Sequence, residues 1–213
     1  MWCAVTGGRG FMARYLVAAL LRSGDWRVRV VDLAPTVVLG TGEAEDLLGA
    51  AIQDGRASYI QGDVRDLAQI TEGTKNVIEA CIMCKVKRLI YTSSSGVVFD
   101  GVHGLFYADE SMPYPFKFVD AYTETKAEGE KIVMKANGTK GLLTCCIRPG
   151  NIFGPGGKNI SMLASSRIWK FMFILGSGKN YDDFVFVENV AHSHICAEKT
   201  LSSEEGAKIA AGQ

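Results

Sequence analysis

Residues 1–14 read MWCAVTGGRGFMAR, and they combine a short apolar run, a glycine-rich turn and the start of an amphipathic segment. Apolar side chains recur at helical spacing from residue 12 onward. A strand, a tight glycine turn and a helix in this order are typical of dinucleotide-binding folds, where phosphates lie at the helix N-terminus. Ala13 takes the last small position of the pattern. We therefore predict a cofactor-binding turn formed by Gly7, Gly8, Arg9, Gly10 and Phe11.

The second predicted strand ends in an acidic residue. Residues 27–32 read RVRVVD, and Asp32 stands about 20 residues after the turn, where such folds place a carboxylate on the adenosine ribose. This position favours NAD over NADP. Two alternatives stay open, because Arg9 could face a 2′-phosphate and Asp32 could simply cap the strand before Pro35.

Composition argues against several classes of function. The chain has 213 residues with 23 basic and 23 acidic side chains and no cluster of either sign, which argues against nucleic acid as a partner. No apolar run approaches 18 residues, so we expect no transmembrane segment, and the early first strand leaves no room for a signal peptide. The six cysteines, including the C-x-x-C pair Cys81 and Cys84, are interpreted as reduced thiols, and no metal site is predicted.

The order of predicted elements departs from a complete doubly wound sheet at one place. A helix over 43–53 and a strand over 57–61 lead to Asp63, which can bond an adenine amino group, and to Val64, which can pack on the ring. Taken alone, Asp63 is only a turn residue. Only helical sequence then separates this strand from the next one at 88–91, although helix, strand and helix are expected there.

A serine cluster and a Tyr-x-x-x-Lys pair supply candidate chemistry. Residues 92–95 read TSSS at the carboxyl end of a strand, and a helix predicted over 121–136 carries Tyr122 and Lys126 four positions apart. Oxidation of an alcohol requires a base, and a lysine ammonium beside an oxidised nicotinamide lowers the pKa of a tyrosine. A serine hydroxyl would hold the substrate oxygen. The pair alone is common on helices, but the ordered combination with the turn and Asp32 favours hydride transfer.

Further elements are predicted toward the end of the chain. They are a strand over 144–148, a helix over 160–171, a short strand over 170–174, an extended segment over 181–187 and a helix over 188–201. Residues 206–213 show no clear end signal.

The chain resembles the extended short-chain dehydrogenase/reductase family, and within it the 3β-hydroxysteroid dehydrogenase/decarboxylase branch with the plant sterol-4α-carboxylate 3-dehydrogenases. The matching stretches are residues 3–11, 86–94, 97–104, 122–137, 141–149 and 183–192. The resemblance implies that Tyr122 is the catalytic acid/base and Lys126 its partner. Ser94 is the first choice for the catalytic serine, with Ser93 and Ser95 as alternatives. Pro149 and its neighbours would line the nicotinamide side.

The resemblance also implies the reaction and its setting. We expect NAD-dependent oxidation of the 3β-hydroxyl of a 4α-carboxysterol, with decarboxylation, at the cytosolic face of the endoplasmic reticulum. The residues alone indicate a soluble cytoplasmic protein. We expect a Rossmann-like domain over 1–150 and part of a substrate-binding region over 151–213. A homodimer is left open, as are another extended-family reductase or epimerase and an inactive nucleotide-binding or interaction protein.

Two departures from the family are expected to matter. A strand four with the start of the following helix is missing between Ile70 and Gly73, a loss of about 30 residues or one βα unit, and the family continues well past Gln213. Either the strand at 88–91 pairs with the first strand, or the edge of the first strand stays unpaired.

Overall fold

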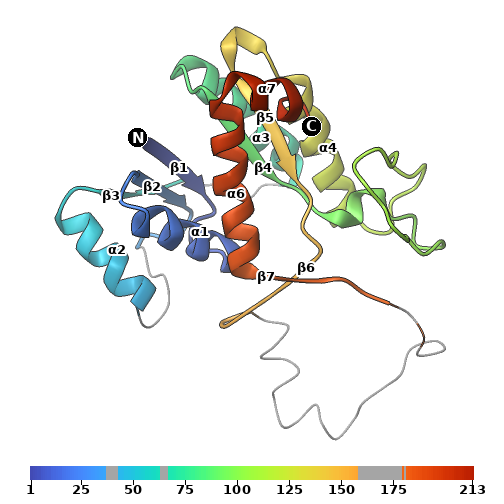
Figure 1. The fold of residues 1–213 in the computed structure, drawn as a ribbon, viewed down its shortest axis with the longest axis horizontal. Helices are drawn as coiled ribbons and strands as arrows, with labels where there is room; N and C mark the ends of the chain where they lie inside the picture. Colours follow the sequence, from blue (N-terminus) through green and yellow to red (C-terminus); the bar gives the residue numbers. More distant parts are fainter. Residues whose placement is uncertain (37–42, 63–66, 158–178, 180) are drawn as a thin grey trace, which may run out of the picture. The chain divides into compact units, whose positions relative to one another are not determined.

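The computed structural model describes residues 1–36, 43–62, 67–157, 179 and 181–213, which form two compact units. The first unit comprises residues 1–62 and 150–192, and the second comprises residues 63–149 and 193–213. Each unit is built from parallel strands and helices (Figure 1). The predicted helix at 160–171 and strand at 170–174 lie outside the described residues, as do Asp63 and Val64.

The first unit contains a three-stranded parallel sheet in the order β1-β2-β3. Its strands are β1 (Trp2–Thr6), β2 (Arg27–Asp32) and β3 (Ala57–Gln61). The helices α1 (Phe11–Arg22) and α2 (Glu43–Gln53) pack against this sheet. Val28 and Val30 are fully buried on the sheet face that meets them, and Val17 and Ala51 are fully buried on the helices. These side chains form the core that holds the glycine turn in place.

A second, two-stranded sheet lies in the same unit. β6 (Asn151–Phe153) pairs in parallel with β7 (Phe184–Phe186), and α6 (Val187–Ser202) follows directly. The extended segment and the helix were predicted from the sequence. β6 was not, because three residues after a proline and a glycine show no usable periodicity.

The second unit is built around another parallel strand pair. α3 (Leu67–Met83) leads to β4 (Arg88–Thr92), the short helix η1 (Ser95–Val98), α4 (Ala121–Lys135), the short helix η2 (Thr139–Gly141) and β5 (Leu143–Ile147). β4 and β5 pair in parallel, and Ile78, Val133 and Leu142 form a buried cluster beside them. A side chain at Gly129 would lie 2.5 Å from the Tyr91 hydroxyl, so only glycine allows α4 to approach β4 this closely.

The last helix, α7 (Glu204–Ala210), was not predicted. Ser203 is its N-cap and accepts a hydrogen bond from the Gly206 N–H at 3.1 Å, and two glutamates occupy its first turn. A serine followed by acidic residues is a recognised helix start, so this signal was present in the sequence.

The structure confirms the Rossmann-like α/β class. It also shows what lies at the position where a fourth strand was expected. α3 is one continuous helix between β3 and β4, with no strand inside its 17 residues. Within the described residues, β1 pairs only with β2 and β4 pairs only with β5. The strands β1 and β4 belong to different units, so the two alternatives for the free edge of β1 stay predictions.

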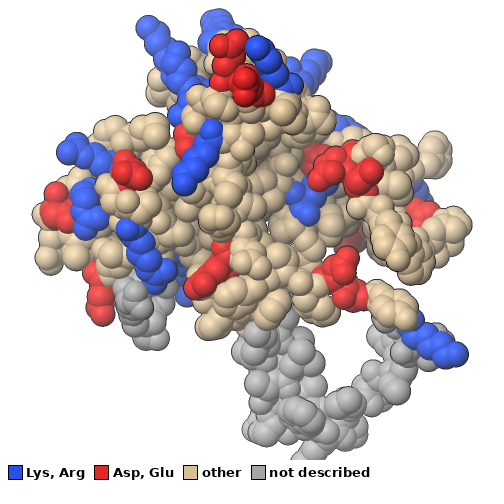
Figure 2. Space-filling model, viewed as in Figure 1, with Lys and Arg blue, Asp and Glu red and all other residues tan. Residues whose placement is uncertain are grey.

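Both signs of charge are present on the surface. Basic and acidic side chains are interspersed on the face shown in Figure 2, where neither sign forms a large patch. In the part of the chain that the structure describes, no helix has both the length and the apolar character needed to cross a bilayer.

Candidate active site

The glycine turn has the geometry that a bound pyrophosphate needs. Gly7 has φ +63°, a left-handed conformation that favours glycine, and its carbonyl accepts a hydrogen bond from the Gly10 N–H at 2.8 Å. A Cβ at Gly8 would collide with Cγ1 of Val30. Gly10 is the N-cap of α1 and supplies no side-chain cap, so the first N–H groups of the helix keep their capacity for an anion. The residues present fit the phosphates of a dinucleotide.

Asp32 is tied to this turn by its carboxylate. Oδ2 accepts from the Arg9 N–H at 2.9 Å, and Oδ1 accepts from the Leu33 N–H at 2.8 Å. A carboxylate has about four acceptor positions, so two remain for ribose hydroxyls. The carboxylate is thus held beside the turn by backbone groups, which suits the role predicted for it.

The second unit brings Ser94 and Tyr122 together. Asp120 caps α4 by accepting from the Thr123 N–H at 2.7 Å, which places Tyr122 in the first turn of the helix. The Ser94 side chain lies close enough to the Tyr122 hydroxyl to lower its pKa. Ser93 is buried, with 3% of its surface exposed, whereas Ser95 is exposed.

Lys126 and Pro149 both make hydrogen bonds at the carboxyl end of the strand pair. The Lys126 ammonium donates to the Thr92 carbonyl at 2.8 Å and lies 5.2 Å from the centre of the Tyr91 ring. Burial lowers the pKa of Lys126. The Pro149 carbonyl accepts from the Ser95 N–H at 3.0 Å, so the end of β5 is joined to the serine turn.

The surroundings of Tyr122 in the chain itself raise its pKa. Partial burial raises this pKa, the Asp120 carboxylate raises it further, and the Ser94 side chain lowers it, for a net increase. The expectation that Lys126 and a bound oxidised nicotinamide together lower this pKa concerns the cofactor complex and stays a prediction.

The Asp120 charge can be removed without removing the helix cap. Because the carboxylate raises the Tyr122 pKa, Asp120→Asn should move the tyrosinate titration to lower pH, and asparagine still caps α4. Spectrophotometric titration, with Tyr122→Phe subtracted, measures the shift. Glu128→Gln, an outward change on the same helix, is the control. An unchanged midpoint in Asp120→Asn would contradict the assignment.

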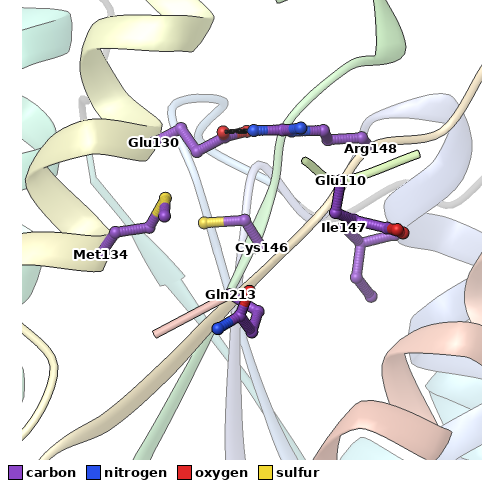
Figure 3. Close-up of a pocket in the computed structure, with 7 residues that line it drawn as sticks. All are labelled: Glu110, Glu130, Met134, Cys146, Ile147, Arg148 and Gln213. Carbon is purple, nitrogen blue, oxygen red and sulfur yellow. Dashed lines mark hydrogen bonds and ion pairs between the residues drawn. The ribbon is translucent and has the colours of Figure 1, made fainter. Parts of the chain in front are cut away.

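A buried ion pair anchors α4 to the end of β5. Glu130 has no exposed surface, and it binds Nη2 of Arg148 at 2.6 Å and accepts from the Tyr114 hydroxyl at 2.6 Å. Figure 3 shows the carboxylate and guanidinium facing each other beside a cavity of about 290 Å³. The cavity is lined by Glu110, Glu130, Met134, Cys146, Ile147, Arg148 and Gln213. Sequence reasoning missed this network, although Glu130 lies one turn beyond Lys126.

The second half of α6 is attached to β4 by polar contacts at both strand ends. Thr92 Oγ1 lies 2.8 Å from Nε2 of His194, which is buried, and Arg88 pairs with Glu198 at 2.7 Å. Thr92 therefore links the Lys126 ammonium, through its carbonyl, with His194, through its hydroxyl.

Loss of the two-pronged guanidinium contact with Glu130 should lower the stability of the protein. Burial alone raises the Glu130 pKa, but hydrogen bonds led by that from Arg148 outweigh it and lower the pKa overall. Arg148→Lys keeps the charge but loses the two-pronged contact, so we expect a loss of about 1.5 kcal/mol in the free energy of unfolding. Urea denaturation measures it.

Lowering the pH should reduce the difference in unfolding free energy between Arg148→Lys and the parent. A lowered folded pKa stabilises the protein above the unfolded pKa, and that contribution disappears as pH falls through the folded value. Lys208→Ala, which removes an exposed ion pair with Glu204, is the control and should change stability little. Equal stability of Arg148→Lys and the parent near neutral pH would contradict the assigned role of the pair.

The fold and these residues place the chain among Rossmann-like proteins with a Ser-Tyr-Lys set. The model of the 3-beta hydroxysteroid dehydrogenase/isomerase family matches residues 4–72 and 67–213, and the chain belongs to this family. Its relatives include the Arabidopsis thaliana 3beta-hydroxysteroid-dehydrogenase/decarboxylase isoform 1, which is 50% identical and covers 100% of this chain and 56% of that protein. The human sterol-4-alpha-carboxylate 3-dehydrogenase, decarboxylating, is 37% identical over 95% of this chain and 58% of its own length.

Solved structures share the fold. The Thermus thermophilus UDP-glucose 4-epimerase in complex with NAD has a TM-score of 0.68 at 24% identity, covering 92% of this chain and 74% of that one. The Bacillus cereus UDP-glucuronic acid 4-epimerase in complex with UDP-glucuronic acid and NAD has a TM-score of 0.72 at 19% identity, covering 97% and 74%. The chain spans about half the length of the curated relatives it matches.

The comparisons also locate the interruption. The alignment with the Arabidopsis relative runs over 245 positions and includes all 213 residues, which leaves 32 positions with no counterpart here. The two matched segments of the family model overlap at residues 67–72. The break in the family match at residues 67–72 agrees with the loss of one βα unit expected between Ile70 and Gly73.

Proposed function

We propose that the protein to which this chain corresponds oxidises the 3β-hydroxyl of a 4α-carboxysterol with NAD, followed by decarboxylation. The observation that carries this proposal is the position of Ser94 beside Tyr122, with Lys126 one helical turn further on, in a chain whose relatives are named as such enzymes. The test is NADH formation and carbon dioxide release with a 3β-hydroxy-4α-carboxysterol. A parallel assay with UDP-glucose tests the alternative that the protein is an epimerase.

In this mechanism Tyr122 removes the hydroxyl proton while Ser94 holds the substrate oxygen. When bound, the nicotinamide accepts the hydride. Lys126 contributes positive charge near the tyrosine and binds the nicotinamide ribose, and Pro149 lines the same side. The product is a β-keto acid, which loses carbon dioxide through the enol of its new ketone, so no further catalytic residue is needed.

The adenosine half of NAD would be held by the first unit. The turn at Gly7, Gly8 and Gly10 binds the pyrophosphate, and Asp32 binds the ribose, as their geometry supports. We assign Arg9 and Phe11 to the same turn, and Asp63 and Val64 to the adenine. Residues 151–213 would contribute part of the substrate-binding region. We place the enzyme at the cytosolic face of the endoplasmic reticulum, with a homodimer as its proposed assembly.

A second candidate function is an inactive nucleotide-binding protein. The observation that favours it is the break in the family match at residues 67–72. Intact cofactor binding without turnover would support this candidate.

Cofactor choice tests the role of Asp32. Asp32→Ala should weaken NAD binding by about tenfold and reduce discrimination against NADP, because the carboxylate accepts from the ribose hydroxyls and repels a 2′-phosphate. Isothermal titration with both cofactors measures the change, with the exposed Asp25→Ala as control. Preference of the unmodified protein for NADP would shift the role to Arg9.

A further inference from the structure

Backbone hydrogen bonds join the serine turn to the end of β5 in the second unit. The N–H groups of Ser93 and Ser95, on either side of Ser94, donate to the carbonyls before and after Arg148 at 2.8 and 3.0 Å. These contacts extend the parallel pairing of β4 with β5 beyond the ends of both strands. The backbone that carries Ser94 is therefore fixed to the backbone that carries Arg148.

The helix α4 carries both Tyr122 and the partner of Arg148. Steps of four residues lead from Tyr122 to Lys126 and on to Glu130, and side chains four positions apart are neighbours on a helix. Glu130 has no exposed surface, and its carboxylate accepts from Nη2 of Arg148 at 2.6 Å and from Nε at 3.1 Å. Glu130 and Arg148 face each other in Figure 3. Their contact joins the helix of Tyr122 to the backbone that holds Ser94.

This ion pair is a more rigid connection than a second polar contact of α4 with the strand ends. In that second contact, the Lys126 ammonium donates a hydrogen bond to the Thr92 carbonyl at 2.8 Å. A lysine ammonium ends a flexible four-carbon stem, whereas a planar guanidinium meets a carboxylate with two donors at once. Glu130 also accepts from the Tyr114 hydroxyl at 2.6 Å, which further restricts its carboxylate.

We propose that Glu130 and Arg148 are a positioning pair, which sets the separation between Ser94 at the strand ends and Tyr122 on the helix. Both act through the segments that they join, rather than by touching substrate or cofactor. Stability alone does not require charges here, because apolar side chains can often replace a buried ion pair with little loss of stability. The inference rests on the proposed function for the role of Ser94 and Tyr122, but its test needs neither substrate nor cofactor.

The test measures how strongly Ser94 influences Tyr122 in the 213-residue chain. Nuclear magnetic resonance of isotope-labelled tyrosine rings follows the titration of Tyr122, and Tyr122→Phe identifies its signal. Because the Ser94 side chain lowers the pKa of Tyr122, Ser94→Ala should raise the titration midpoint. When Arg148→Lys is also present, this rise should fall to less than about half of its value in the parent, since the separation is no longer fixed.

Thr144→Val is the matched control for a general loosening of the same two elements. Thr144 is buried near the start of β5, and its hydroxyl donates to the Val133 carbonyl of α4 at 3.0 Å. The variant removes this buried hydrogen bond and should lower the stability of the protein. The rise caused by Ser94→Ala should nevertheless remain as large as in the parent.

A double variant separates positioning from stability. Glu130→Met combined with Arg148→Met removes both charges and keeps long side chains, so the chain should stay folded, as urea denaturation can verify. The rise caused by Ser94→Ala should again fall to less than about half.

An unchanged rise in Arg148→Lys or in the double variant would overturn the proposal and leave the pair with a stabilising role only. Absence of the rise in the parent would also overturn it, because Ser94 and Tyr122 would then have no fixed separation. An equal reduction in Thr144→Val would overturn it in favour of general loosening. Failure of sterol turnover would leave all these results as they are, so it is distinguishable from failure of this inference.

Discussion

Replacing Tyr122 with phenylalanine is expected to lower kcat for sterol oxidation by a factor of about 10² or more and to leave NAD affinity nearly unchanged. In the proposed reaction the ionised Tyr122 oxygen takes the substrate proton, and the Ser94 side chain lies beside it. The aromatic ring stays in phenylalanine, so packing of the first turn of α4 should be retained. Steady-state kinetics on a form with the missing segment inserted measures the effect.

The control for this change is Tyr107→Phe. Tyr107 is fully exposed on the loop before α4 and has no role in the proposed reaction, so its variant should turn over normally. A kcat for Tyr122→Phe equal to that of the parent would remove Tyr122 from the mechanism. A parallel loss of NAD affinity would instead indicate that the hydroxyl positions the cofactor.

Regular elements with strong periodicity were predictable from the sequence. The strands at 27–32 and 57–61 and the helix at 43–53 match the structure at both ends, because glycine, proline and charged residues bound each apolar pattern. The expected helix at 121–136 ends at Lys135 in the structure. Short elements without a full period, β6 and α7, were missed.

The site was only partly predictable. Spacing along the chain favoured Ser94, Tyr122 and Lys126, and the structure describes how these side chains are held. The contact between Glu130 and Arg148 joins residues 18 positions apart on different elements, and no local pattern signals it. The burial and the Asp120 charge that raise the Tyr122 pKa depend on how the loop before α4 folds, and no local pattern signals them.

Insertion of the missing βα unit is expected to have the largest effect on activity. In the usual strand order 3-2-1-4-5-6, strand four lies beside strand one and forms half of the cofactor crevice. β1 has no strand partner on that side within the described residues. A misplacement of about 1 Å can already reduce a rate by about 10²-fold. We therefore expect the chain as written to be poorly stable and to show little or no dehydrogenase activity, despite its intact signature residues.

The comparison requires two proteins that differ only in the segment at residues 70–73. Both carry the downstream sequence of the Arabidopsis relative, since this chain covers 56% of that protein. One of them also carries the 32-residue insertion, and urea denaturation of both should show a higher unfolding midpoint with the insertion.

The most direct measurement is NAD-dependent turnover of a 3β-hydroxy-4α-carboxysterol by these two proteins under the same conditions. The account predicts a turnover at least about 10²-fold higher with the insertion, together with tighter NAD binding. Comparable turnover and comparable NAD binding in the two proteins would contradict it and would show that the strand–helix unit is dispensable for catalysis.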